Sequence, residues 1–219
     1  SEDPGRDRWH PTGATMSLAR RRHLADLADQ HDLLIVEDDP YGAIRFAGEP
    51  LPPIASFTDR VVYLSPFSKI VAPGFRVGWM IGPPEVMSWV ARAKQAADLH
   101  TSSFAQFLLA NVVQQPGWLD AQKARIVPMY RDRCVALADA LEAALGDRIS
   151  FHRPDGGMFL WTRFTDIPDT TALLQHALRE GVAFVPGNAF TIDQVPDSKA
   201  RFSYSTLSPA QLGTAVQRL

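Results

Sequence analysis

Cysteine is almost absent from this chain of 219 residues, since Cys134 is the single example. One cysteine excludes an intramolecular disulfide framework and a cysteine-rich zinc module. It also fits a reducing compartment, so we expect a cytoplasmic protein. The six histidines do not show the H-E-x-x-H spacing of a zinc-binding helix, and we predict no metal site.

An excess of charge and a long apolar run are also missing. Lysine plus arginine number 22 and aspartate plus glutamate number 24, which leaves a formal net charge of −2. A dedicated nucleic-acid binder is usually basic, so we expect no nucleic acid to be bound by this chain itself. No apolar run approaches the roughly 20 residues that span a bilayer, and Ser1–Arg8 lacks a signal-peptide core. We therefore expect no membrane partner.

The first half of the chain alternates apolar runs with helical patterns. The runs at 33–36, 61–64 and 77–81 end in polar, glycine or proline residues. Such runs predict buried strands of an α/β sheet that is covered on both faces. Ser17 is the expected N-cap of a helix that extends to about residue 30. Three successive arginines should form the solvated face of this helix: Arg20, Arg21 and Arg22.

A helical pattern also covers about 85–115, where Pro116-Gly117 ends it. The next helix, 118–145, contains Pro128, which predicts a kink or a break. Beyond it the pattern changes to short strands with two helices, namely strands 149–151, 157–164, 182–185 and 201–205, and helices 170–179 and from Pro209. We therefore predict two domains, part of a larger α/β domain over 1–115 and a small α+β domain over 116–219.

Several polar side chains follow the second predicted strand. Lys69 lies where that strand ends, which is either a solvated end or the position of a functional amine, because sites in open α/β sheets lie beyond the carboxyl ends of strands. A lysine amine can condense with a carbonyl group. Arg76 can bind a phosphate with its fork of N–H groups, and Ser65 and Ser68 supply hydroxyl groups nearby. A carbonyl compound that bears a phosphate would satisfy all four.

Asp38 and Tyr41 follow the first predicted strand. They could form an Asx-type turn and a packed tyrosine. As a pair they could instead hold a heterocyclic nitrogen protonated and hydrogen-bond an aromatic oxygen of the same ring. Arg201, in the last strand, is either an edge residue or the bidentate partner of a substrate carboxylate.

Six segments in this order carry a resemblance to a known family: HPTG at 10–13, EDDPYG at 37–42, FSKIVAPGFRVGW at 67–79, GGMFLW at 156–161, VAFVPGNAF at 182–190 and ARFSYS at 200–205. By these segments the chain resembles the fold-type I, pyridoxal-phosphate-dependent aminotransferases of class I/II. It looks most like the branch with the 2-aminoadipate and kynurenine aminotransferases. The aminotransferase-like domains of MocR regulators are similar too.

The resemblance implies the C-terminal half of such an enzyme, with part of a mixed sheet, flanking helices and a small α+β domain. It implies pyridoxal 5'-phosphate as cofactor and a homodimer. Lys69 would be the Schiff-base lysine and would move the proton at Cα of the substrate. The other implied roles are the ring nitrogen for Asp38, the phenolic oxygen for Tyr41, the phosphate for Arg76 with Ser68, and the substrate α-carboxylate for Arg201.

Two residues depart from the pattern of this family. His10 stands where the family usually has an asparagine that donates to the phenolic oxygen of the cofactor, and a neutral histidine can donate one such bond. Pro66 replaces a serine or threonine that touches the phosphate, and Ser65 could substitute for it. The chain also begins well past the first third of the family pattern. The part of the pattern before this point carries a glycine-rich phosphate turn.

These features predict transamination between an amino acid and a 2-oxo acid. One alternative is a cofactor-sensing effector or dimerisation domain of a MocR-type transcriptional regulator. Another is an incomplete or degenerate relative without catalysis.

Overall fold

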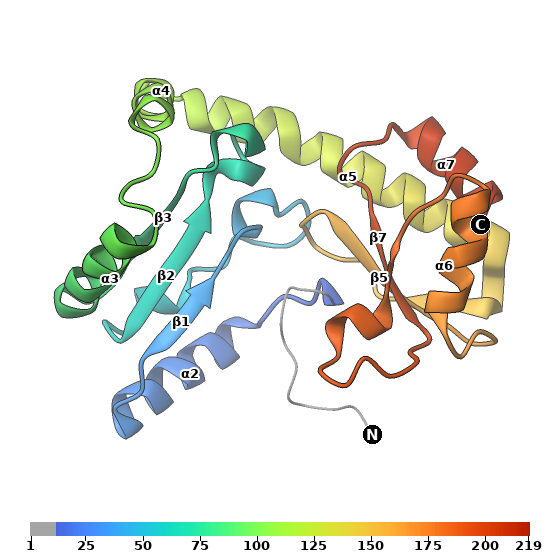
Figure 1. Ribbon diagram of the computed structural model, residues 1–219, viewed down its shortest axis with the longest axis horizontal. Helices are drawn as coiled ribbons and strands as arrows, with labels where there is room; N and C mark the ends of the chain where they lie inside the picture. The colour runs from blue at the N-terminus through green and yellow to red at the C-terminus, as the bar shows by residue number, and fades with distance from the viewer. Residues whose placement is uncertain (1–11) are drawn as a thin grey trace. The chain divides into compact units, whose positions relative to one another are not determined.

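The computed structural model describes residues 12–219, and these residues form two compact units (Figure 1). One unit is Met16–Ile126, and the other is Val127–Leu219 together with residues 12–15. The division falls inside helix α5 (Trp118–Leu145), next to Pro128. The sequence predicts a domain boundary after residue 115, shortly before this helix.

The unit Met16–Ile126 contains a three-stranded sheet in the order β1-β2-β3. Strands β1 (Ile35–Asp38) and β2 (Val61–Pro66) are parallel, and β3 (Gly78–Ile81) runs antiparallel to β2. Helix α2 (Leu18–His31) packs on this sheet through Ala25, which belongs to the buried cluster of Ile54 and Val61. The hydroxyl of Ser17 accepts from the Arg20 N–H, so the predicted N-cap is confirmed.

Two elements of this unit differ from the prediction. The first strand lies at 35–38 rather than 33–36, and Leu33 and Leu34 are about half exposed. The predicted helix over 85–115 is two helices, α3 (Pro84–Ala97) and α4 (Ser103–Val113). The hydroxyl of Ser102 caps the start of α4 by accepting from the Ala105 N–H, and this capping signal interrupts the apolar pattern.

The expected cover over both faces of the sheet is not found among residues 12–219. All four residues of β3 are exposed, and α3 has no buried residue. Val36 in β1 is 62% exposed and Ile81 in β3 is 66% exposed. Within the described residues this unit therefore leaves much of its apolar surface in solvent.

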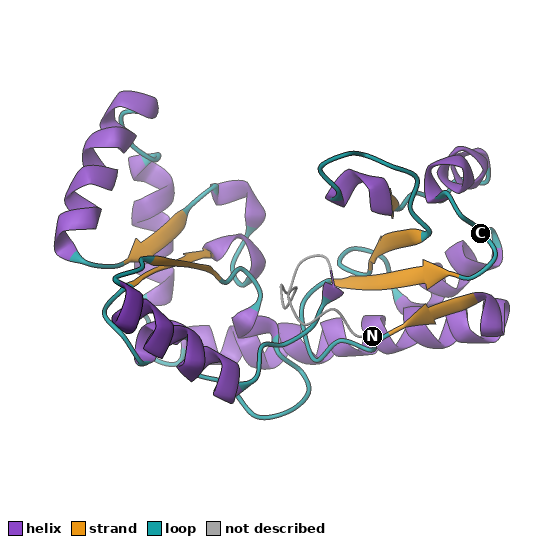
Figure 2. Ribbon diagram, turned by 90° about the horizontal axis from the view of Figure 1, so that it is seen from below, coloured by secondary structure: helices purple, strands orange, loops and turns teal. Residues whose placement is uncertain are grey.

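The other unit contains an antiparallel sheet in the order β4-β5-β7-β6. Its strands are β4 (Ile149–Phe151), β5 (Phe159–Phe164), β6 (Val185–Pro186) and β7 (Lys199–Ser203), and its helices besides α5 are α6 (Thr170–Arg179) and α7 (Pro209–Gln217). One face of the sheet is buried through Leu160, Ala200 and Phe202. Figure 2 shows α5 running along these strands, and its side chains at Leu137, Ala138 and Leu141 are buried. This unit therefore has a closed core.

Helix α5 continues through Pro128, so the predicted break does not occur there, and a kink at this proline stays a prediction. In the described part of the chain, no helix combines the length and the apolarity that a membrane crossing requires.

Candidate active site

Three of the predicted residues lie at or just beyond the carboxyl ends of β1 and β2. Asp38 is the last residue of β1 and lies opposite Leu64 of β2. Lys69 closes the short helix η3 (Phe67–Lys69), which follows β2 directly. Tyr41 is buried, and Nζ of Lys69 lies 6.0 Å from the centroid of its ring. Because the parallel strands end at the same edge, the amine, the carboxylate and the phenol come from neighbouring strand ends.

Arg76 and Ser68 form a second pair beside this edge. Nη1 of Arg76 donates to Oγ of Ser68 at 3.4 Å and to the carbonyl of Pro73 at 3.3 Å. Arg76 has a φ of 52°, in the left-handed region that a non-glycine residue rarely adopts. The Phe67 N–H donates to the Val77 carbonyl at 3.0 Å, which ties the segment of Ser68 to the start of β3. An arginine held in a costly backbone conformation beside a serine hydroxyl suits an anion site.

The remaining predicted residues lie elsewhere. Ser65 in β2 is opposite Trp79 of β3, and the alternation of side chains places Ser65 on the other side of the sheet from Asp38. His10 lies outside the described residues. Arg201 belongs to the other unit, in β7.

Asp39 fastens the turn that carries Asp38 and Tyr41, a role that sequence reasoning missed. Its Oδ2 accepts from the Tyr63 hydroxyl at 2.8 Å, and its Oδ1 accepts from the Gly42 N–H at 2.7 Å. Burial and the neighbouring Asp39 carboxylate raise the pKa of Tyr63, so this phenol stays a proton donor. Asp39 is the second aspartate of the 37–42 motif, but no local pattern links it to a tyrosine 24 residues further along the chain.

A buried ion pair lies behind the same strand. Nη1 of Arg21 is 3.3 Å from Oε1 of Glu37, and the two side chains are 8% and 11% exposed. The solvated face expected for all three arginines is therefore wrong for Arg21. Its guanidinium also donates to the carbonyls of Met16 and Pro52, each at 3.2 Å. These acceptors meet the hydrogen-bonding need of a buried guanidinium.

The carboxylate of Glu37 is held from the opposite direction by backbone groups. It accepts from the Ile54 N–H at 3.1 Å and from the Ala55 N–H at 3.3 Å. Burial nevertheless raises the pKa of Glu37, against the lowering effect of these two bonds and of Arg21. Glu37 therefore links β1, α2 and the 53–56 segment immediately before Asp38.

Arg201 lies on the half-buried face of the antiparallel sheet. It pairs with Trp161 of β5 and with Val185 of β6. Its guanidinium carbon lies 4.1 Å from the centroid of the Phe159 ring and 4.9 Å from that of Phe190. The sequence did not predict a role for either phenylalanine.

The donor set of the first unit suits an aromatic aldehyde that carries a ring nitrogen, a phenolic oxygen and a phosphate. An amine, a carboxylate, a phenol and an arginine–serine pair can each address one of these groups. Pyridoxal phosphate has all four, so the residues present fit the cofactor that the resemblance implies.

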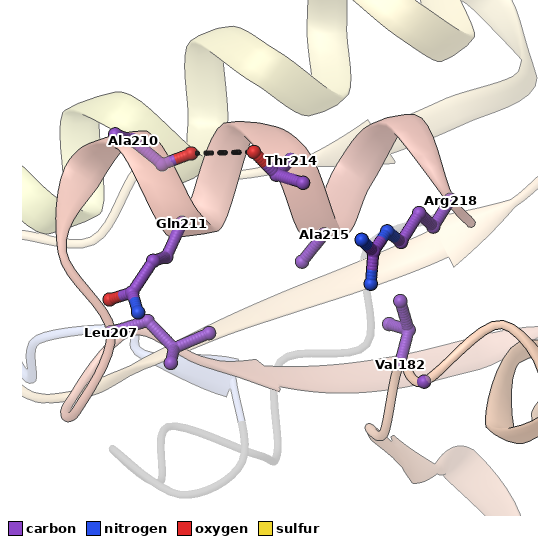
Figure 3. A pocket seen from close by; sticks show the side chains of 8 residues that line it. Val182, Leu207, Ala210, Gln211, Thr214, Ala215 and Arg218 are labelled. Carbon is purple, nitrogen blue, oxygen red and sulfur yellow. Dashed lines mark hydrogen bonds between the residues drawn. The ribbon is translucent and has the colours of Figure 1, made fainter.

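Other features of the described residues do not join this site. A hollow of about 370 Å³ lies between α7 and the segment before β6 (Figure 3). Its walls contain none of the predicted site residues, and they consist of Gly181, Val182, Leu207, Ala210, Gln211, Thr214, Ala215 and Arg218. From residue 12 onward, no group of three or more histidine, cysteine, aspartate or glutamate residues is arranged to hold a metal ion.

Comparisons with known proteins agree on one family. The family model described as aminotransferase class I and II matches residues 9–219. The chain is 38% identical over 212 residues to aromatic-amino-acid aminotransferase 1 of Thermococcus litoralis, a match that covers 96% of this chain and 51% of that relative. It is also 30% identical to the uncharacterized HTH-type transcriptional regulator YisV of Bacillus subtilis, over 95% of this chain and 43% of the regulator.

A solved structure matches as well. LysN, the alpha-aminoadipate aminotransferase of Thermus thermophilus complexed with N-(5'-phosphopyridoxyl)-L-leucine, has a TM-score of 0.89 at 33% identity. The match covers 95% of this chain and 54% of LysN. The chain thus spans about half the length of the curated relatives it matches.

Proposed function

The chain belongs to the class I and II aminotransferase family, and from this premise we propose that it takes part in transamination between an amino acid and a 2-oxo acid. The observation that supports the proposal is the position of Asp38, Tyr41 and Lys69 at or just beyond the carboxyl ends of two neighbouring parallel strands, with the Arg76–Ser68 pair next to Lys69 in the chain. These five side chains come from three separate segments, and folding brings them into one unit.

Four of these side chains would bind pyridoxal phosphate without taking part in bond making. The carboxylate of Asp38 holds a proton on the ring nitrogen, and the hydroxyl of Tyr41 donates to the phenolic oxygen. Arg76 with Ser68 binds the phosphate through N–H and O–H donors. The bound cofactor supplies a conjugated ring that takes up the electron pair left at Cα of the substrate.

Lys69 is the residue for which we propose chemistry. Its Nζ would hold the aldehyde carbon of the cofactor and, when the substrate is bound, would accept and return the proton at Cα of the substrate. Arg201 binds the α-carboxylate of the substrate with its fork of N–H groups. Contributions from Ser65 and His10 stay predictions.

An absorption spectrum of the chain with added pyridoxal phosphate tests the proposal. We expect a visible band that is absent in Lys69→Ala, that persists in the control Lys94→Ala, and that bleaches when an amino acid is added. Lys94 is a suitable control because it is a solvated helix residue paired with Asp98. Borohydride reduction followed by peptide mass spectrometry should place the cofactor on Lys69. A band that survives in Lys69→Ala would refute the assignment.

A second candidate is favoured by the similarity to the regulator YisV. In this case the chain would bind pyridoxal phosphate through Lys69 as an effector without turning over an amino acid. The same spectra separate the two functions, since an effector domain gives the Lys69-dependent band but releases no 2-oxo acid. A chain with neither band nor product would be the non-catalytic relative.

The homodimer and the cytoplasmic location also remain proposals. The resemblance supports the first and the single cysteine the second. Light scattering on the purified chain and fractionation of the source cells measure them directly.

A further inference from the structure

Arg201 stands on the more open face of the antiparallel sheet. The residues on either side of it, Ala200 and Phe202, are buried in the core, so alternation directs Arg201 to the opposite face. Trp161 lies directly across from it in β5. Phe159 is two residues before Trp161 and shares this face. The arginine and the aromatic rings therefore lie on one side of the sheet, and each is half-buried.

Two aromatic rings contact the guanidinium of Arg201. The centroid distances of 4.1 Å to Phe159 and 4.9 Å to Phe190 are within the roughly 6 Å over which a cation is attracted to a ring face. The ring of Phe190 is itself held by Trp161, edge to face, at a centroid distance of 5.2 Å and an interplanar angle of 88°. The Phe190 ring is thus fixed from a second side.

The backbone before Phe190 is fixed as well. Phe190 ends the short helix η6 (Gly187–Phe190), whose first N–H donates to Oγ1 of Thr170 at 3.2 Å. The same hydroxyl donates to the carbonyl of Lys199 in β7 at 2.6 Å. A side chain on Gly187 would put its Cβ 2.8 Å from the Lys199 carbonyl, so only glycine allows this approach. The segment that presents Phe190 is thereby anchored to the strand of Arg201.

We propose that Phe159 and Phe190 are positioning residues for the carboxylate-binding Arg201. The inference rests on the role proposed above for that arginine. A guanidinium whose carbon lies over two aromatic rings is attracted to both of them, which holds its fork of N–H groups in one place for bidentate recognition of a carboxylate. The rings also restrict the rotamers of a long side chain, which lowers the entropy lost on binding. The ligand class is the carboxylate shared by an amino acid and its 2-oxo acid.

Substitutions that remove one ring but keep apolar volume test this role. In Phe190→Leu and in Phe159→Leu we expect KM for both the amino acid and the 2-oxo acid to rise about three- to tenfold, as the loss of one cation–ring contact suggests. Because Arg201 acts in binding, kcat and the affinity for pyridoxal phosphate should change less than about twofold. Phe190→Tyr and Phe159→Tyr keep the ring and should restore KM. The control Phe151→Leu alters a β4 residue opposite Thr162, whose side chain belongs to the buried face.

A second readout does not depend on turnover. In the cofactor-free chain labelled with ¹⁵N-arginine, we expect the Nε–H proton of Arg201, assigned by its loss in Arg201→Lys, to be shifted upfield by the rings. Titration with 3-phenylpropanoate as the probe should move this resonance in the wild type and the tyrosine variants. In the leucine variants the upfield shift should shrink and the Kd of the probe should rise about three- to tenfold.

The two readouts separate the possible failures. If the wild type gives no Lys69-dependent band, the proposed function fails, while the probe titration still decides the role of the rings. An Arg201 resonance that ignores the probe in the wild type would overturn the inference. So would leucine variants with unchanged KM and Kd, or tyrosine variants no better than leucine, because packing alone would then explain the phenylalanines.

Discussion

At the scale of single residues, Glu37 is a carboxylate whose burial should leave a pH signature. Its pKa is raised above the ordinary value of 4.5 by burial. The folded state therefore holds the proton more tightly than the unfolded state. The stability that this proton contributes is complete below the unfolded-state pKa and is lost as the pH rises through the folded-state pKa.

We expect the Glu37→Gln variant to remove this dependence. As the pH rises from about 4 to about 8, the free energy of unfolding of the wild type should fall relative to that of the variant, because glutamine has no proton to lose. Urea unfolding over a pH series measures the difference. Glu49→Gln is the matched control, since Glu49 is exposed. A difference that stays constant with pH, or that grows in the opposite direction, would contradict the raised pKa.

Arg21 is the partner that makes the burial of Glu37 tolerable. Arg21→Met keeps most of the aliphatic length but leaves the buried carboxylate without its cation, and should cost about 3 kcal/mol of unfolding free energy. Arg20→Met, on the exposed side of α2, should cost less than about 0.5 kcal/mol. Because the loss comes from the stranded charge, adding Glu37→Gln to Arg21→Met should recover part of it. Equal effects of the two arginine variants would mean that the ion pair contributes nothing.

Tyr63 supports the turn that contains two of the proposed cofactor-binding residues. Its hydroxyl bond to Asp39 fixes the turn that presents Asp38 and Tyr41. Tyr63→Phe removes one hydrogen bond, so the affinity for pyridoxal phosphate should fall about fivefold, and fluorescence titration measures it. Tyr130→Phe, in α5, is the control and should leave the affinity unchanged. If both variants bind equally, the turn does not need this bond.

At the scale of elements, local sequence signals predicted where helices begin better than they predicted how strands pair. The helix start at Ser17 and the terminal helix from Pro209 are confirmed, because capping residues and proline act through their immediate neighbours. The predicted strand 182–185 contributes only Val185 to a strand, since pairing with β7 decides its length. Local patterns could not reveal which partner strand was available.

In the candidate site, too, the sequence predicted some residues and missed others. Motif residues such as Lys69 and Asp38 were visible because their types and order carry the family pattern, and the family model confirms that pattern. The residues that hold them were not visible. The bond between Asp39 and Tyr63 joins residues 24 positions apart, and nothing local marks it.

Pro128 in helix α5 allows a prediction about the stability of this helix. A proline inside a helix removes one backbone hydrogen bond and crowds the preceding turn. Because Pro128 is exposed, Pro128→Ala should raise the free energy of unfolding by about 1–3 kcal/mol and slow amide exchange in the neighbouring turn. Val135→Ala, at another exposed position of α5, should gain no more than about 0.5 kcal/mol. A loss of stability in Pro128→Ala would show that the proline itself is required at this place in the helix.

At the scale of the whole molecule, the two units differ in how completely they bury their apolar side chains. The unit Val127–Leu219 encloses Leu160, Ala200 and Tyr204 completely. The unit Met16–Ile126 leaves Phe104 75% and Phe107 72% exposed, both on α4. Contiguous exposed apolar surface drives dye binding and association in water.

The exposed face of α4 should therefore dominate the surface behaviour of this chain. Phe104→Ser combined with Phe107→Ser should lower the fluorescence of a bound apolar dye and the light scattering of concentrated solutions. Because both rings are exposed, the free energy of unfolding should change by less than about 1 kcal/mol. Ile192→Ser is the control, since Ile192 is fully exposed but belongs to a loop of the other unit and not to α4. Equal dye binding by the double variant and the wild type would mean that α4 is not the surface that recruits the dye, and the bare strands β1 and β3 would be the next to substitute.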